Sequence, residues 1–144
     1  MKPAEVKPHE ALRDIERAAA SAGCLFINPP PVASGLRDHA RGAVARACRL
    51  SRPTRSNKSR LPLAIAAAVN AAEAVDGMAR EAACPFDRAV IHAPAVYLRE
   101  AAAVARACLA PGDSALSEAA RLAALDSAAA LAAARAATEG GEMK

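Results

Sequence analysis

Residues 61–83 read LPLAIAAAVNAAEAVDGMAREAA, an alanine-rich stretch broken only by single charged or bulky side chains. Its larger apolar residues recur every three or four positions, which is the spacing of one face of an α-helix. The stretch therefore predicts a long helix over 62–83, ending before Cys84-Pro85. The face that we expect to be buried comprises Leu61, Ile65, Val69, Ala72, Val75 and Ala79.

The whole chain shares this composition. Alanine supplies 43 of the 144 residues, whereas Leu, Ile, Val, Phe and Tyr together supply 27. Alanine has the highest intrinsic helix propensity, and the β-branched and aromatic residues that favour strands are few. The composition predicts an all-α fold, and the length fits a single domain over 1–144.

Four further helices follow from their start and stop signals. Pro8 and Pro94 are suited to a first helical turn, and Ser34 and Ser114 are suited to cap a helix N-terminus. Three consecutive prolines forbid a helix over 29–31, and SRPTRSNKSR (51–60) has the composition of a loop. The predicted helices are 8–23, 34–50, 94–110 and 114–138, and the final residues GGEMK are expected to be a frayed, disordered tail. The last helix has poor periodicity, with Leu116 and Leu131 on one side and Leu122 and Leu125 on the other, which suits a helix contacted on two sides.

The sequence also contains an internal similarity. A shift of 60 residues aligns Cys24 with Cys84 and Cys48 with Cys108, and superimposes AVARAC at 43–48 on an identical AVARAC at 103–108. We interpret this as a duplication with units 1–60 and 61–120 and a truncated third unit over 121–144; chance similarity in an alanine-rich chain is the alternative. The predicted fold is a five-helix bundle of two helical hairpins and a closing helix.

The two halves differ in the charge of equivalent helices. Arg37, Arg41 and Arg49 in the second helix align with apolar positions in the fourth. We therefore expect the fourth helix to be central and the second helix to lie at an edge, with its arginines toward water.

A basic segment surrounds that second helix. Between residues 37 and 60 the net charge is +7, while the rest of the chain sums to −3. Such a concentration attracts phosphate backbones or acidic protein surfaces, although a merely solvated edge is the plainer explanation. The candidate binding residues are Arg37, Arg41, Arg46, Arg49, Arg52, Arg55, Lys58 and Arg60.

Metal and catalytic chemistry have weak sequence support. The four cysteines are spaced too far apart for a structural zinc motif, so we expect small, buried thiols and no metal or cofactor. Cys84, Asp87 and His92 could form a nucleophile, base and orienting group, but no phosphate-binding loop or hydrolase motif accompanies them. The chain is therefore predicted to be non-enzymatic.

Location and assembly follow from composition. The apolar, charge-free stretch 61–72 is too short to span a bilayer, and the N-terminus lacks the apolar segment of a signal peptide. We expect a cytoplasmic protein, and its alanine and arginine bias is typical of GC-rich bacterial genomes. Flat alanine faces at 101–107 and 128–134 favour close packing, either within one subunit or in a homodimer.

Three functional hypotheses follow. The first is a helical interaction module that holds an acidic protein through the basic segment 37–60. The second is a nucleic-acid-binding protein that uses the same residues. The third is a small enzyme or ligand carrier with a site between helices, which involves Cys84 or His92.

Overall fold

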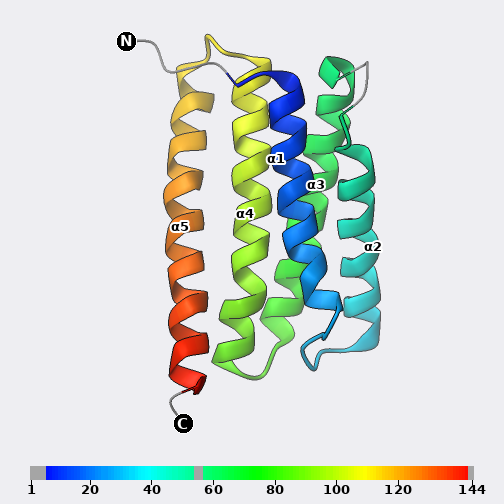
Figure 1. Ribbon diagram of the computed structural model, residues 1–144, viewed down its shortest axis with the longest axis vertical. Helices are drawn as coiled ribbons and strands as arrows, with labels where there is room; N and C mark the ends of the chain where they lie inside the picture. Colours follow the sequence, from blue (N-terminus) through cyan, green and yellow to red (C-terminus); the bar gives the residue numbers. More distant parts are fainter. Residues whose placement is uncertain (1–5, 54–56, 143–144) are drawn as a thin grey trace.

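The computed structural model describes residues 6–53 and 57–142, and in these ranges the protein is an all-α bundle of five helices and one short 3₁₀ turn (Figure 1). The elements are α1 (Pro8–Gly23), η1 (Cys24–Phe26), α2 (Ser34–Leu50), α3 (Asn57–Glu81), α4 (Pro85–Leu109) and α5 (Ser114–Glu142). The predicted fold class is confirmed, and α1, α2 and α5 begin at the residues that the sequence indicates.

The prediction is wrong at the start of α3 and α4. Helix α3 begins five residues before Pro62, and α4 begins at Pro85, so Pro94 lies inside a helix. Pro85 occupies the first-turn position that the sequence analysis gave to Pro94. Proline in a helix interior removes one backbone hydrogen bond, at a cost of about 3 kcal/mol. In α4 this cost is offset by burial on both sides of Pro94, where Ile91, Ala95 and Leu98 are fully buried.

The C-terminal end also differs from the prediction. Helix α5 continues through Glu142, so the backbone of residues 139–142 is helical rather than frayed. Residues 143 and 144 of the predicted tail lie outside the described part of the chain.

Four helices form the core of the bundle, and the fifth packs against its outside. Helices α1 to α4 enclose the core, with α4 against α1, α3 and α5. Helix α2 contacts α1 and α3, and α5 packs chiefly on α4 at the outer edge of the bundle (Figure 1). The predicted central place of the fourth helix and edge place of the second are both confirmed.

The core consists largely of alanine with a few bulkier side chains. The predicted apolar face of α3 is buried, with Val69 partly so. Fully buried larger residues are Leu12, Ile15, Leu61, Val75, Met78, Ile91 and Leu98. Because most core positions carry only a methyl group, stability depends on close approach of the helix backbones.

The structure does not confirm the internal duplication. In the first unit, Cys24-Leu25-Phe26 forms η1 and a loop over 27–33 follows. In the second unit, Phe86 already lies in α4, and residues 87–93, which would match that loop, are helical. The two Cys-x-Phe segments therefore have different structural roles, and the repeat units stay a prediction.

One helix of the described chain could span a membrane by length and composition alone. It covers Lys58–Glu81. An 18-residue window of this helix has a mean hydropathy of 1.2, and 56% of that window is buried inside the bundle. The core helix of a soluble protein meets the same criteria, so this finding is compatible with a soluble bundle. The cytoplasmic location stays a prediction.

Candidate functional site

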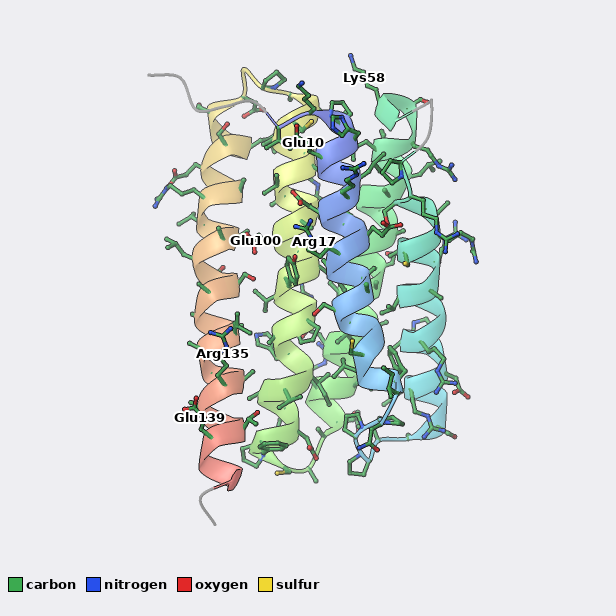
Figure 2. The ribbon with its side chains drawn as sticks, viewed as in Figure 1. Glu10, Arg17, Lys58, Glu100, Arg135 and Glu139 are labelled. Carbon is green, nitrogen blue, oxygen red and sulfur yellow. The ribbon has the colours of Figure 1, made fainter. Side chains whose placement is uncertain are left out.

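The predicted basic segment lies on α2, the following loop and the first turn of α3. Arg41, Arg46, Arg49, Arg52 and Lys58 are exposed, and Lys58 projects from the end of the bundle (Figure 2). Arg37 and Arg60 are partly buried, and Arg55 lies outside the described residues. At about 100° per residue, the arginines of α2 spread over more than one face of the helix rather than forming a single stripe.

Several of these cations already have partners within the chain. The Arg41 guanidinium carbon lies 5.7 Å from the centre of the Phe26 ring, a cation–π distance. Arg52 Nε lies 3.9 Å from a Glu16 carboxylate oxygen. Arg37 Nε lies 3.9 Å from Asp38 Oδ1, yet this buried atom makes no hydrogen bond to the described residues.

Arg46 and Arg49 differ from the other arginines of α2. Both are exposed, and neither forms an ion pair with any described residue. Arg49 lies on the outward side of the helix, whereas Arg46 borders a hollow between α2 and α3. Together with the exposed Lys58, these two arginines are the exposed cations of the basic segment that have no ion pair with the described residues.

The hollow beside Arg46 has a volume of about 890 Å³. Its charged and polar walls come from α2, α3 and α4, with both signs of charge present: Asp38, His39, Arg46, Asn70, Glu73, Arg80 and Arg99. The volume falls in the range of about 300–1,000 Å³ that ligand pockets occupy. No sequence pattern indicates this hollow, because its lining residues come from three separate helices.

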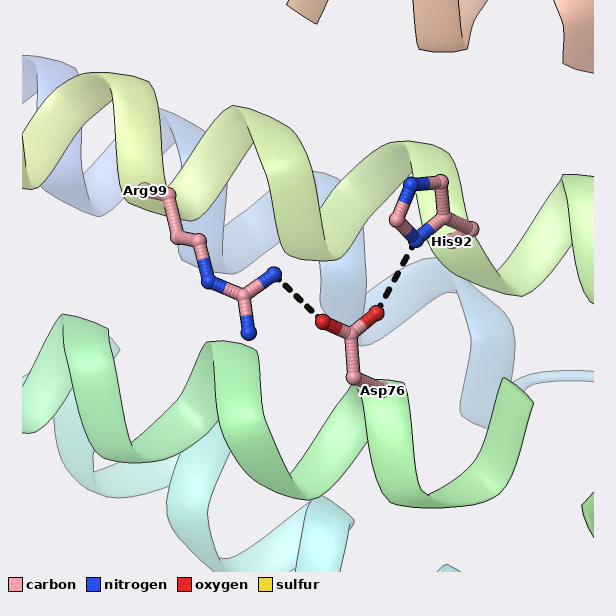
Figure 3. Close-up of polar contacts among 3 residues, drawn as sticks. All are labelled: Asp76, His92 and Arg99. Carbon is pink, nitrogen blue, oxygen red and sulfur yellow. Dashed lines mark hydrogen bonds and ion pairs between the residues drawn. The ribbon is translucent and has the colours of Figure 1, made fainter. Parts of the chain in front are cut away.

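A second polar cluster connects α3 to α4 (Figure 3). Asp76 Oδ1 lies 3.0 Å from His92 Nδ1, and Asp76 Oδ2 forms an ion pair with Arg99. The Asp76 side chain is only 14% exposed, so both of its oxygens require partners. In a neutral His92 whose Nδ1 donates to Asp76, Nε2 is the acceptor nitrogen. His92 also lines two smaller hollows of about 490 Å³ each, one against α5 and one beside Arg80 and Arg88.

Of the three residues Cys84, Asp87 and His92, which the sequence offered as a weakly supported catalytic combination, His92 has a different partner. His92 pairs with Asp76 on the neighbouring helix, and Cys84 is an exposed residue that precedes α4. In an antiparallel hairpin whose turn centres on residue 84, positions 76 and 92 lie opposite each other. This pairing could not be predicted from the sequence, because His92 was expected to lie in the loop between the predicted helices 62–83 and 94–110.

The cysteines follow the prediction in part. They form no disulfide with one another. Cys48 and Cys108 are partly buried against the core, and the Cys108 thiol donates to the Val6 carbonyl at 2.9 Å. Cys24 and Cys84 are exposed, which contradicts the expectation of four buried thiols; both lie at helix–loop junctions at the bundle end.

Across residues 6–53 and 57–142 no three His, Cys, Asp or Glu side chains are grouped closely enough to hold a metal ion.

One ion pair lies on α5, away from these sites. Arg121 donates two hydrogen bonds to Glu118, and the first of them, from Nε, is 2.9 Å long. Hydrogen bonding to Arg121 lowers the pKa of the Glu118 carboxyl, and the same contact raises the pKa of Arg121.

Comparison of the chain with protein-family models, curated proteins and solved structures finds no match. The class is therefore defined by the fold and its surfaces alone: a small α-helical bundle with an exposed basic helix and polar hollows between helices.

Proposed function

We propose that the protein is a non-enzymatic interaction module that binds an acidic protein surface through the basic α2 surface. This surface consists of Arg41, Arg46, Arg49, Arg52 and Lys58. The observation that supports the proposal most directly is the exposure of Arg46 and Arg49 without a carboxylate partner among the described residues.

The physical argument concerns uncompensated charge. The eight cations between residues 37 and 60 repel one another, and the carboxylates of Asp38 and Glu16 lie close only to Arg37 and Arg52. An anionic partner relieves this repulsion and is attracted over the Debye length, about 8 Å at physiological salt. Complementary charge of this kind accelerates association and selects partners.

An acidic protein fits this surface better than single-stranded nucleic acid does. Single-strand binding needs aromatic platforms on which bases stack. The Phe26 ring, which contacts this surface, is covered by Arg41. Nucleic acid remains the alternative partner for the same residues.

The test compares two charge-reversal variants of equal net charge. The first is Arg46→Glu/Arg49→Glu on the basic α2 surface. The control is Arg106→Glu/Arg135→Glu on α4 and α5, where both arginines are exposed and Arg106 has the same AVARAC sequence context as Arg46. The probes are a labelled glutamate-rich peptide and a short DNA duplex, each titrated at two salt concentrations.

We expect the α2 variant to bind the peptide about tenfold more weakly, equivalent to about 1.4 kcal/mol, and the control to bind nearly as wild type does. Tighter binding of the duplex, with a steep dependence on salt, would assign nucleic acid as the partner instead. Equal binding by the two variants would show that the basic α2 surface is only solvated.

The hollow of about 890 Å³ favours a second candidate, a carrier of a small ligand with both positive and negative groups. Arg46, Arg80 and Arg99 can hold an anionic group, and Glu73 can hold a cationic one. The test for binding of the anionic group is to add inorganic phosphate and to record the amide chemical shifts by NMR. Shifts confined to residues that line this hollow would support a ligand carrier, and the absence of shifts would count against it.

A further inference from the structure

Helix α5 is unusual among the five because none of its described side chains is buried. Residues 114–139 are all exposed or partly buried, although the helix has 29 residues. Three of its four leucines point into solvent: Leu122 is 48% exposed, Leu125 57% and Leu131 47%. A surface helix of a monomer normally presents charged and polar residues on its outward side.

The burial pattern separates two seams on this helix. The partly buried residues form the inner seam toward α4: Leu116, Ala120, Ala123, Ser127, Ala130, Ala134 and Ala137. Their spacing alternates between four and three, which is the heptad spacing of helices that pack along their length.

The opposite side repeats the same spacing. Residues at alternating intervals of three and four form an outer seam, all of them exposed: Ala115, Glu118, Leu122, Leu125, Ala129, Ala132 and Ala136. At about 100° per residue, Leu125 lies about 180° from Leu116. Glu118 is the one charged member, and its carboxylate is neutralised along the helix by Arg121. α5 lies at the outer edge of the bundle, so residues 6–53 and 57–142 leave this seam exposed, with Ala129 at its margin bordering the hollow between α4 and α5 (Figure 1).

We propose that the outer seam of α5 binds the same seam of a second copy of this chain, with the two helices antiparallel. The leucines occupy the first half of the seam and the alanines the second half. In a parallel pair, leucine would face leucine at one end and alanine would face alanine at the other. One interhelical distance cannot satisfy both ends, because it depends on the side chains at the contact.

The antiparallel arrangement removes this conflict. With the two-fold axis near residue 127, Leu122 meets Ala132 of the partner copy, Leu125 meets its Ala129, and Glu118 meets its Ala136. Each large side chain then faces a small one, and the contact is closed and self-complementary. The seam from Ala115 to Ala136 is about 32 Å long, at 1.5 Å per residue. Two single helices of this length form a small interface, so we expect a dimer that dissociates in the micromolar range.

The first test measures mass in solution as a function of concentration. Sedimentation velocity should show a shift from 14.7 kDa toward twice that mass as the concentration of wild type rises. Leu122→Glu/Leu125→Glu should remain monomeric. The matched control, Ala124→Glu/Leu131→Glu, changes two exposed residues of α5 outside both seams and should dimerise as wild type does.

The second test measures orientation through engineered cysteines. Glu118→Cys and Ala136→Cys are too far apart on one helix to bond within a chain, but an antiparallel pair brings them together between chains. The double variant should form a covalent dimer under mild oxidation, and each single variant should form no more than wild type does. Efficient crosslinking of the Glu118→Cys single variant would show a parallel pair and overturn the antiparallel proposal.

A protein that is monomeric at all concentrations, or a dimer unaffected by Leu122→Glu/Leu125→Glu, would overturn the proposal as a whole. The basic α2 surface lies on a different helix from the outer seam. The Arg46→Glu/Arg49→Glu variant should therefore dimerise normally, and the two proposals can fail separately.

Discussion

Asp76 lies in a polar cluster between α3 and α4, where its side chain is only 14% exposed. It is nearly buried, and it serves two partners on α4, His92 and Arg99. Through these two contacts the Asp76 carboxylate links α3 to α4. Its loss leaves two polar groups on α4 without their common acceptor.

Replacement of Asp76 by Asn should therefore lower the free energy of unfolding. We expect a loss of about 1.5–3 kcal/mol, the range for hydrogen bonds to charged groups. The free energy of unfolding is measured by urea titration, with circular dichroism as the signal. Asp126→Asn is the control, because Asp126 is exposed and has no ion pair in the described structure, and its effect should stay within about 0.5 kcal/mol. Equal effects of the two substitutions would show that the Asp76 cluster adds no stability.

Glu118 gives a prediction about pH. Its pKa is lowered by the hydrogen bonds from Arg121, so the pair stabilises folded α5 above the unfolded-state pKa. This contribution is present at neutral pH and is lost as the pH falls through the lowered pKa. Titration of the carboxyl by NMR should show an upward shift of its pKa in Arg121→Gln. An unchanged midpoint would mean that the pair does not persist in solution.

At the scale of elements, the starts of α1, α2 and α5 could be predicted from the sequence. Helices α2 and α5 begin at Ser34 and Ser114 as predicted, but neither serine caps its helix: α2 has no side-chain cap, and at α5 the Asp113 carboxylate accepts hydrogen bonds from the N–H groups of Ala115 and Leu116. The prediction failed where two prolines compete, since both Pro85 and Pro94 suit a first turn and only packing of Ile91 against the core decides between them. The Asp76–His92 pair was missed for the same reason, because its register depends on where α4 begins. The two seams of α5 could be found only once burial showed which side faces α4.

The interior proline gives a prediction about α4. Pro94→Ala supplies the N–H that proline lacks, so the Val90 carbonyl gains a helical hydrogen bond. We expect stabilisation of about 1–3 kcal/mol, seen as a higher thermal midpoint. Pro85→Ala is the control, since a proline in the first turn costs no hydrogen bond, and it should change little. Destabilisation by Pro94→Ala would show that the ring itself makes packing contacts that alanine cannot replace.

At the scale of the whole molecule, the alanine core sets how closely the helices approach. Each buried methyl contributes roughly 0.8 kcal/mol, so many close contacts must replace the few large ones of an ordinary core. Such a core has no room for a larger side chain. Ala68 on α3 is fully buried, whereas Ala66, two residues earlier on the same helix, is exposed.

The same substitution at these two positions should therefore have different effects. Ala68→Leu forces α3 away from its neighbours and should destabilise the bundle by about 1–3 kcal/mol, the usual cost of overpacking. Ala66→Leu replaces one good helix-forming residue by another at an exposed position. The free energy of unfolding should therefore change by less than about 0.5 kcal/mol. Urea unfolding of both variants measures the difference directly. If Ala68→Leu were as stable as wild type, the helices would have to be packed loosely enough to admit three extra carbon atoms. The fold would then rest on helix propensity and the few large core residues rather than on close packing of alanine.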